Sequence, residues 1–218
     1  MNYLIIGGSK SGKSEVGEKI ALTLSRKPKS ENRNFTFRSS NFPLWASMIW
    51  CESLTQRTHV SRVSLNKVIY IATMKPYDKE DEERIRKHIQ NRVGLNFITF
   101  EVQRNLHEIV KSIHQNDTVL IDSITSLLTN EMFVGAEIIK NPSKNILNGL
   151  KQIMFKAQNA IIVSDYIFND AIEYDEVTEN FKRELAILNK ELAKICDNVM
   201  ECSFGNIRYI KYEEKTVL

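Results

Sequence analysis

A short apolar segment at the start of the chain leads directly into a glycine-rich loop, and this pair constrains the fold more than any other feature. The segment is Tyr3–Ile6, and the loop is Gly7-Gly8-Ser9-Lys10-Ser11-Gly12-Lys13-Ser14. The loop matches the pattern Gly-x-x-x-x-Gly-Lys-Ser/Thr in full. Its glycines let the backbone turn tightly, so that N–H groups can point at phosphate oxygens. The order strand, loop and helix therefore predicts a phosphate-binding loop (P-loop) that opens a nucleotide-binding α/β domain.

The same loop assigns roles to individual side chains. We expect all eight residues from Gly7 to Ser14 to bind nucleotide. Lys13 is the catalytic candidate, because its charge would reach the β- and γ-phosphates. Ser14 is a metal candidate, because its hydroxyl would bind Mg²⁺. A helix beginning near Ser14 would add its positive N-terminal dipole.

A second acidic element is expected on another strand end. The run Thr118-Val119-Leu120-Ile121-Asp122 is apolar and closes on a carboxylate. This arrangement is typical of the acidic strand that completes a P-loop site, where the carboxylate helps to hold Mg²⁺. We therefore predict that Asp122 contacts metal and nucleotide. The alternative is that Asp122 is a helix N-cap or a turn residue after the strand.

Short β-branched runs alternate with longer helix-like segments along the rest of the chain, as in βαβ units. The sequence therefore predicts an α/β fold like that of P-loop NTPases, with a mostly parallel sheet flanked by helices and an antiparallel C-terminal edge. The expected strands are 3–6, 68–72, 97–101, 118–121, 160–164, 198–201 and 207–210. The expected helices are 14–24, 79–91, 106–114, 124–133, 145–156 and 176–195.

We predict one domain over residues 1–218, interrupted by an irregular insertion at about 26–66. The insertion opens with a polar, basic stretch and then carries several aromatics, including both tryptophans, Trp45 and Trp50. Because aromatic side chains are costly to leave in water, part of it should pack on the domain. Two interpretations remain open: a surface excursion with a small apolar cluster, or a lid over the substrate.

Bulk properties exclude several classes of protein. No apolar run approaches the length of ~20 residues that a membrane-spanning helix needs, and the N-terminus lacks the pattern of a signal peptide. The three cysteines are widely spaced, so neither a disulfide framework nor a zinc site is expected. The net charge of +3 does not indicate nucleic acid. We expect a cytoplasmic protein.

One histidine lies in a basic stripe. In the helix expected at 79–91, Arg84, His88 and Arg92 follow one another at spacings of four and so project from one side. Neighbouring like charge disfavours protonation of an imidazole, which leaves a nucleophilic nitrogen available. The alternative is a solvated helix face whose acidic start and basic end complement the helix dipole.

Several short motifs, in their order along the chain, resemble one enzyme family. They are the loop at 7–14, Tyr70-Ile71-Ala72-Thr73, Arg84-Ile85-x-x-His88-x-x-x-Arg92, Phe97-x-Thr99-x-Glu101, the segment 122–130, and Leu188-Asn189-x-x-Leu192-Ala193. The ordered set resembles the bifunctional adenosylcobinamide kinase/adenosylcobinamide-phosphate guanylyltransferase family of cobalamin biosynthesis. The resemblance spans nearly the whole chain except residues 26–66.

This resemblance implies a homo-oligomeric P-loop enzyme that acts on a corrinoid with Mg²⁺ and with GTP or ATP. Such an enzyme phosphorylates the aminopropanol hydroxyl of adenosylcobinamide. It then transfers GMP from GTP, through a GMP-histidine intermediate, to give adenosylcobinamide-GDP. His88 matches the guanylylated histidine and is thus a second catalytic candidate. Further nucleotide-contacting positions are matched by Ala72, Thr73, Met74, Ile89, Gln90, Asn91, Arg92, Glu101 and Asp122.

The chain also departs from the family pattern. The segment 164–168 lacks the Asn-Glu-Val-Gly usual there, and Val93 stands where a proline is usual. Two alternatives therefore remain: a P-loop kinase or nucleotidyltransferase that acts on another small-molecule alcohol, and a nucleotide-dependent binding switch. The absence of an Asn-Lys-x-Asp guanine-binding motif in the sequence counts against the switch.

Overall fold

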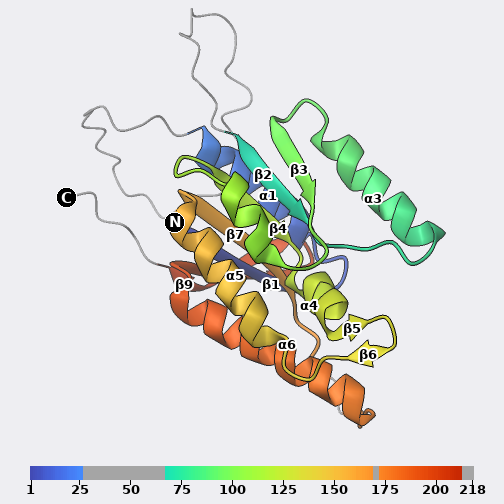
Figure 1. Ribbon diagram of the computed structural model, residues 1–218. Helices are drawn as coiled ribbons and strands as arrows, with labels where there is room; N and C mark the ends of the chain where they lie inside the picture. The colour runs from blue at the N-terminus through green and yellow to red at the C-terminus, as the bar shows by residue number, and fades with distance from the viewer. Residues whose placement is uncertain (27–66, 169–171, 213–218) are drawn as a thin grey trace, which may run out of the picture.

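The computed structural model describes residues 1–26, 67–168 and 172–212, so almost all of the expected insertion at 26–66 lies outside the described residues. Seven strands form one sheet in the order β3-β2-β4-β7-β1-β8-β9 (Figure 1). Every neighbouring pair is parallel except β8 and β9, which are antiparallel. The predicted fold class is confirmed. The strands are β1 (Asn2–Gly7), β2 (Val68–Ala72), β3 (Phe97–Glu101), β4 (Thr118–Asp122), β7 (Asn159–Asp165), β8 (Asn198–Ser203) and β9 (Asn206–Tyr212).

The central strands are apolar throughout because helices cover both faces of the sheet. Successive strand side chains point to opposite faces, so Leu4 packs into one hydrophobic core and Ile5 into the other. Helix α1 (Lys13–Ser25) supplies the second core. The first core is covered by α4 (Ile124–Met132), α5 (Ser143–Lys156), α6 (Glu176–Ile195) and the 3₁₀ helix η2 (Leu106–Ser112) (Figure 1).

Helix α6 turns one apolar face toward the first core. Leu185, Leu188 and Leu192 on this face are fully buried. The helix also supports its neighbour, because the carboxylate of Glu184 accepts a hydrogen bond of 3.0 Å from the backbone N–H of Ser143. That bond satisfies a donor at the start of α5 that has no partner within its own helix.

Two local predictions are wrong. Residues 106–114 were expected to form an α-helix, but a 3₁₀ helix forms there and ends at Ser112. Residue 133 was expected to continue α4, but the chain instead enters a small hairpin of β5 (Phe133–Val134) and β6 (Glu137–Ile138). Gly135, with a positive φ of 62°, permits this tight reversal.

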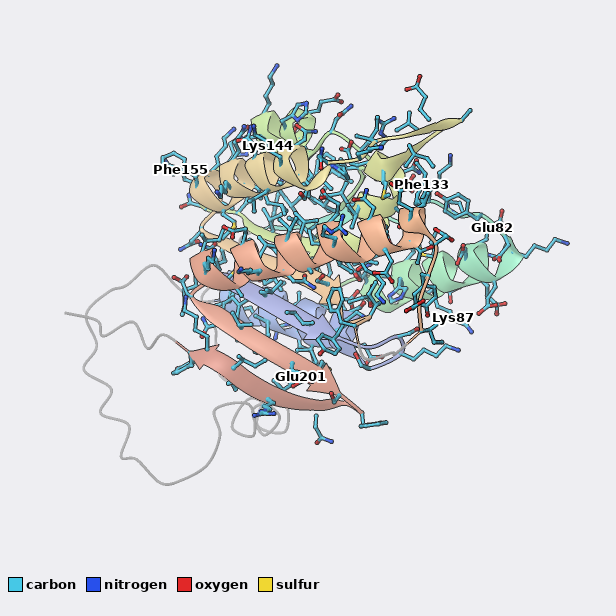
Figure 2. The ribbon with its side chains drawn as sticks, turned by 90° about the horizontal axis from the view of Figure 1, so that it is seen from below. Glu82, Lys87, Phe133, Lys144, Phe155 and Glu201 are labelled. Atoms are coloured by element: carbon cyan, nitrogen blue, oxygen red, sulfur yellow. The ribbon has the colours of Figure 1, made fainter. Side chains whose placement is uncertain are left out.

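Helix α3 (Lys79–Arg92) lies beside the sheet next to β3 (Figure 1). It begins at Asp78, whose carboxylate accepts a hydrogen bond from the N–H of Asp81 at 2.9 Å. Figure 2 shows Lys87 of α3 and Phe155 of α5 at opposite ends of the molecule. Within residues 1–26, 67–168 and 172–212, no helix is long and apolar enough to span a membrane.

Candidate active site

The P-loop lies at the carboxyl edge of the sheet, where β1 ends. Gly7 has no room for a side chain, because a Cβ there would lie 2.5 Å from the carbonyl oxygen of Cys202 and 2.5 Å from Oγ of Ser11. Gly12 adopts a left-handed φ of 89°, which glycine alone tolerates without strain. These two glycines therefore allow the tight course of the loop into α1.

Neighbouring strands hold the loop in place. The N–H of Tyr166, just after β7, donates to the carbonyl oxygen of Gly7 at 3.0 Å. On the other side, the carbonyl oxygen of Ser11 accepts from the N–H of Gly205 and from Sγ of Cys202, both at 3.1 Å. Cys202 is a free, buried thiol.

Lys13 and Ser11 provide donors that suit phosphate. The Nζ of Lys13 donates to the carbonyl oxygen of Gly8 at 2.9 Å and forms an ion pair of 2.6 Å with Oδ1 of Asp165. The hydroxyl of Ser11 is buried and has no hydrogen-bond partner within residues 1–26, 67–168 and 172–212. A buried polar atom without a partner costs free energy, so this hydroxyl fits a loop that completes its bonding with an anion.

A cavity of about 820 Å³ opens above the loop and joins most of the predicted site. Residues of the P-loop, of α3 and of the ends of β2, β3, β4 and β7 line it. The lining includes Ser9, Lys10, Ser11, Gly12, Lys13, Ser14, Tyr70, Ala72, Met74, His88, Arg92, Glu101, Asp122 and Asp165. His88 and the P-loop, 74 positions or more apart in the sequence, thus face one space.

Asp122 is the last residue of β4, and a hydrogen bond from Tyr70 holds its carboxylate. The hydroxyl of Tyr70 donates to its Oδ2 at 2.8 Å. Burial, together with the negative charge of Asp122, raises the pKa of Tyr70 above the usual range, so the phenol stays protonated and remains a donor. Ser123, rather than Asp122, caps α4, because its Oγ accepts from the N–H of Ser126. The alternative role of Asp122 as helix cap is therefore wrong.

Arg92 is buried beneath the cavity wall rather than extended into solvent. Its guanidinium carbon lies 3.5 Å from the centre of the Tyr70 ring, and its Nε donates to the carbonyl oxygen of His88 at 2.9 Å. The same Nε lies 3.9 Å from Oε1 of Glu18. Nη1 is buried and has no hydrogen-bond partner in the part of the chain that the structure describes. The charge of Arg92 is therefore engaged in packing α3 against α1 and β2.

Glu18 is a buried acid on α1. Burial raises its pKa to about 7, although the nearby Arg92 guanidinium acts in the opposite direction and Asp122 and Glu15 add to the rise. A carboxyl group with this pKa changes charge near neutral pH. The interface between α1 and α3 therefore contains a titratable group next to a permanently charged one.

Some predicted residues do not line the cavity. Gly7 and Gly8 shape the loop from behind, and Ile89 and Gln90 are exposed on α3 away from the lining. Thr73 is fully buried, where its hydroxyl donates to the carbonyl oxygen of Ser123. The side chains of Asn91 and Arg84 lie outside the described structure, so the three-residue stripe is described only for His88 and Arg92.

Some residues that contact predicted site residues were not themselves predicted from the sequence, among them Glu18, Tyr70 and Asp165. Asp165 has the same signal as Asp122, a carboxylate that closes an apolar run, and could have been found by it. Tyr70 lies within one of the family-like motifs, but its hydroxyl cannot be paired with Asp122 without the register of β2 against β4. Glu18 has no such signal, because it looks like an ordinary surface residue of an amphipathic helix.

The donor set suits Mg²⁺ bound together with a nucleotide. Ser14 and Asp122 both line the cavity and offer hard oxygen ligands. Among the described residues, no three or more histidine, cysteine or acidic side chains group as a metal site. Mg²⁺ does not require such a group, because it keeps several waters and is held by one or two carboxylates and by substrate phosphates.

Comparison with known proteins adds one match. A family model described as "Cobinamide kinase / cobinamide phosphate guanyltransferase" matches residues 53–209, well over half of the chain. The matched range contains α3 with His88, the end of β4 with Asp122 and the end of β7 with Asp165, whereas the P-loop precedes it. No curated protein matches the chain. The chain belongs to the cobinamide kinase/cobinamide phosphate guanyltransferase family, whose members transfer phosphorus-containing groups.

Proposed function

We propose that this enzyme phosphorylates the aminopropanol hydroxyl of adenosylcobinamide and then transfers GMP from GTP to the product through a covalent GMP-histidine on His88. The observation that carries the proposal is the shared cavity, in which His88 of α3 and the P-loop face one another. One cavity of about 820 Å³ is large enough for a nucleotide and part of an acceptor. Family membership supplies the reaction class.

For the kinase step, the P-loop would bind the triphosphate of ATP or GTP. Lys13 would leave Asp165 for the β- and γ-phosphates, and the unpartnered hydroxyl of Ser11 would gain an acceptor. Ser14 and Asp122 would hold Mg²⁺, which neutralises charge on the phosphates when bound. Tyr70 fixes the orientation of the Asp122 carboxylate by its hydrogen bond. The loop is already held by its neighbours, so binding would require little reordering.

For the guanylyl step, an imidazole nitrogen of His88 would attack the α-phosphorus of GTP. An N–P bond forms, the bond to the bridging oxygen breaks, and pyrophosphate leaves. An oxygen of adenosylcobinamide phosphate then attacks the same phosphorus and releases the histidine. A covalent intermediate divides one difficult transfer into two easier ones. Arg92 supports this role for the helix, because its bond to the His88 carbonyl oxygen fixes the backbone that carries the nucleophile.

The proposal extends to the domain organisation and assembly of the protein. We propose a single domain, because β1 near the N-terminus and β9 near the C-terminus belong to one sheet. We also propose a cytoplasmic homo-oligomer. Among the described residues β9 is an edge strand, and it exposes Tyr209, Ile210 and Tyr212, a surface that a second subunit would cover. Light scattering of the purified protein tests this part, and a monomeric mass would contradict it.

The test of the main proposal is formation of the covalent intermediate. Purified protein is incubated with α-labelled GTP and Mg²⁺, denatured, and examined for label and intact mass. Wild type should carry a GMP adduct that is labile in acid and stable in base, and His88→Ala should carry none. His107→Ala is the matched control, because His107 is exposed on η2 and does not line the cavity. It should form the adduct normally.

The other outcomes are equally informative. No adduct on wild type, with nucleotide still bound, would contradict the histidine mechanism and favour a P-loop kinase or a nucleotide-dependent switch. An adduct together with failure to phosphorylate adenosylcobinamide would favour a different acceptor alcohol. His88→Ala should retain phosphorylation of adenosylcobinamide, because the two steps use different nucleophiles. Equal loss of both activities in this variant would mean that His88 is structural.

A further inference from the structure

We infer that Asp165 is the general base of the kinase step, the group that accepts the proton of the attacking hydroxyl. This inference rests on the proposed function of the P-loop as the kinase site. Asp165 is the last residue of β7, the strand that lies between β1 and β4. The end of β7 therefore lies between the ends of β1 and β4, and Asp165 lines the same cavity.

The first support is the distance to Lys13. Oδ1 of Asp165 lies 2.6 Å from Nζ of Lys13, the group that a P-loop directs at the β- and γ-phosphates. A carboxylate in contact with this ammonium group is next to the position of the phosphoryl group that is transferred. Five acidic residues line the cavity in the described part of the chain, and Asp165 is the one paired with Lys13. The five are Glu15, Glu82, Glu101, Asp122 and Asp165.

The second support is that Asp122, the other candidate for the general base, already has interaction partners. Asp122 accepts the hydroxyl of Tyr70 and is the candidate for Mg²⁺, so its negative charge is used in holding a cation. Asp165 has a cation partner only in Lys13, among the contacts of the described structure. When phosphates draw Lys13 away, Asp165 faces an anion without a counter-charge. Its carboxylate oxygens are then without a hydrogen-bond donor from Lys13 and can accept one from the attacking hydroxyl.

The third support is the rigidity of Asp165. Its backbone N–H donates to Oγ1 of Thr125 at 3.1 Å, and its carbonyl oxygen accepts from Nδ2 of Asn189 at 3.2 Å. Asn189 is in turn held by the hydroxyl of Ser164 at 2.6 Å. A general base has to stay within hydrogen-bond reach of the proton that it takes. These bonds fix the residue from α4, α6 and its own strand.

The phosphoryl transfer needs no reagent other than the nucleotide and the acceptor alcohol. The hydroxyl oxygen of the acceptor attacks the γ-phosphorus, and the new O–P bond forms as the bond to the bridging β,γ-oxygen breaks. The electron pair of that bond leaves with the nucleoside diphosphate. The hydroxyl proton passes to a carboxylate oxygen of Asp165 and is returned to water after the products leave.

The test compares Asp165→Asn with wild type in kinase turnover, nucleotide affinity and Mg²⁺ requirement. Asn keeps the size of the side chain and removes the proton acceptor. We expect the kinase kcat to fall by roughly 10²–10⁴-fold, the usual contribution of a general base. The dissociation constant for nucleotide and the Mg²⁺ concentration for half-maximal rate should stay near wild type. Asp165→Glu, which restores a carboxylate on a longer arm, should recover part of the rate.

Two results would overturn the inference. Turnover of Asp165→Asn close to wild type would show that no base is needed at this position. A loss of turnover matched by an equal loss of nucleotide affinity, or by a raised Mg²⁺ requirement, would show that Asp165 only holds Lys13 or the metal. Thermal unfolding of both variants checks that they are folded.

Hydrolysis of the nucleotide tests the role of Asp165 independently of which alcohol is the acceptor. Slow hydrolysis of the bound nucleotide uses water in place of the corrinoid hydroxyl and needs the same proton transfer. If wild type does not phosphorylate adenosylcobinamide, the proposed function fails, but Asp165→Asn should still slow this hydrolysis by a similar factor. Unchanged hydrolysis would overturn the role of Asp165 by itself.

Discussion

The guanidinium carbon of Arg92 lies 3.5 Å from the centre of the Tyr70 ring, and the hydroxyl of that ring donates to Asp122. The face of the Tyr70 ring thus contacts α3, the helix that carries the candidate nucleophile His88. The hydroxyl of the same ring binds Asp122, the candidate metal ligand. Arg92 completes the connection, because its Nε donates to the carbonyl oxygen of His88. The two proposed reaction centres are therefore joined by one buried set of contacts.

Replacing Arg92 by lysine should weaken this connection. Lysine keeps the charge but loses the flat guanidinium that stacks on Tyr70 and the Nε–H that bonds to His88. We expect a loss of about 1–2 kcal/mol in unfolding free energy, the size of a desolvated cation–π contact, and slower formation of the GMP adduct. Urea unfolding and single-turnover labelling measure the two effects. Arg183→Lys, at an exposed position of α6, is the control, and an equal change there would refute the role of the stack.

Glu18 should make stability depend on pH near neutrality. Its pKa in the folded state is about 7, above its usual value of 4.5, so the folded protein holds this proton more tightly than the unfolded chain. The resulting stabilisation is fully present below about pH 4.5 and is lost as pH rises through about 7. Glu18→Gln remains neutral throughout. Its melting temperature, relative to wild type, should therefore rise between these two pH values and level off above them.

A flat difference between the two proteins over that range would show that Glu18 titrates normally. The two melting temperatures are compared at each pH in the same buffer, so that the titration of all other groups affects both proteins equally. Glu80→Gln, at an exposed position in the first turn of α3, serves as the control for removing a carboxylate.

Gly7 and Gly8 should respond differently to alanine. A Cβ at Gly7 would lie 2.5 Å from a backbone oxygen, whereas a Cβ at Gly8 meets nothing within 4 Å. Backbone cannot move aside cheaply, so Gly7→Ala should lower both stability and nucleotide affinity, by at least about tenfold in affinity. Gly8→Ala should leave the melting temperature nearly unchanged. Thermal unfolding and titration with a fluorescent nucleotide measure the pair, and equal behaviour of both variants would contradict the described loop.

Lys13→Ala should abolish kinase turnover, because the phosphates lose their main cationic partner in the loop. A reduction of at least about 10²-fold in kcat is expected for removal of such an electrostatic group. Lys19→Ala is the matched control, since Lys19 is exposed on the same helix and does not line the cavity. A coupled assay of nucleoside diphosphate release gives both rates. Turnover of Lys13→Ala close to that of the control would contradict the proposed role of the P-loop.

The sequence alone determined the fold class and the phosphate loop, for a local reason. Apolar runs such as Tyr3–Ile6 and the glycine spacing at 7–14 act through backbone sterics and burial, which neighbouring residues decide. The local sequence is compatible with more than one structure at residues 106–114 and at the end of α4. Packing and a glycine turn decided the structure at these two places.

The tertiary structure decided which of these residues meet. The pairing of Lys13 with Asp165 depends on β7 lying next to β1, and the bond from Tyr70 to Asp122 depends on the register of β2 against β4. The pKa of Glu18 depends on burial under α3. Contacts between residues more than 50 positions apart arise from strand order and helix packing, which the local pattern of one sequence does not contain.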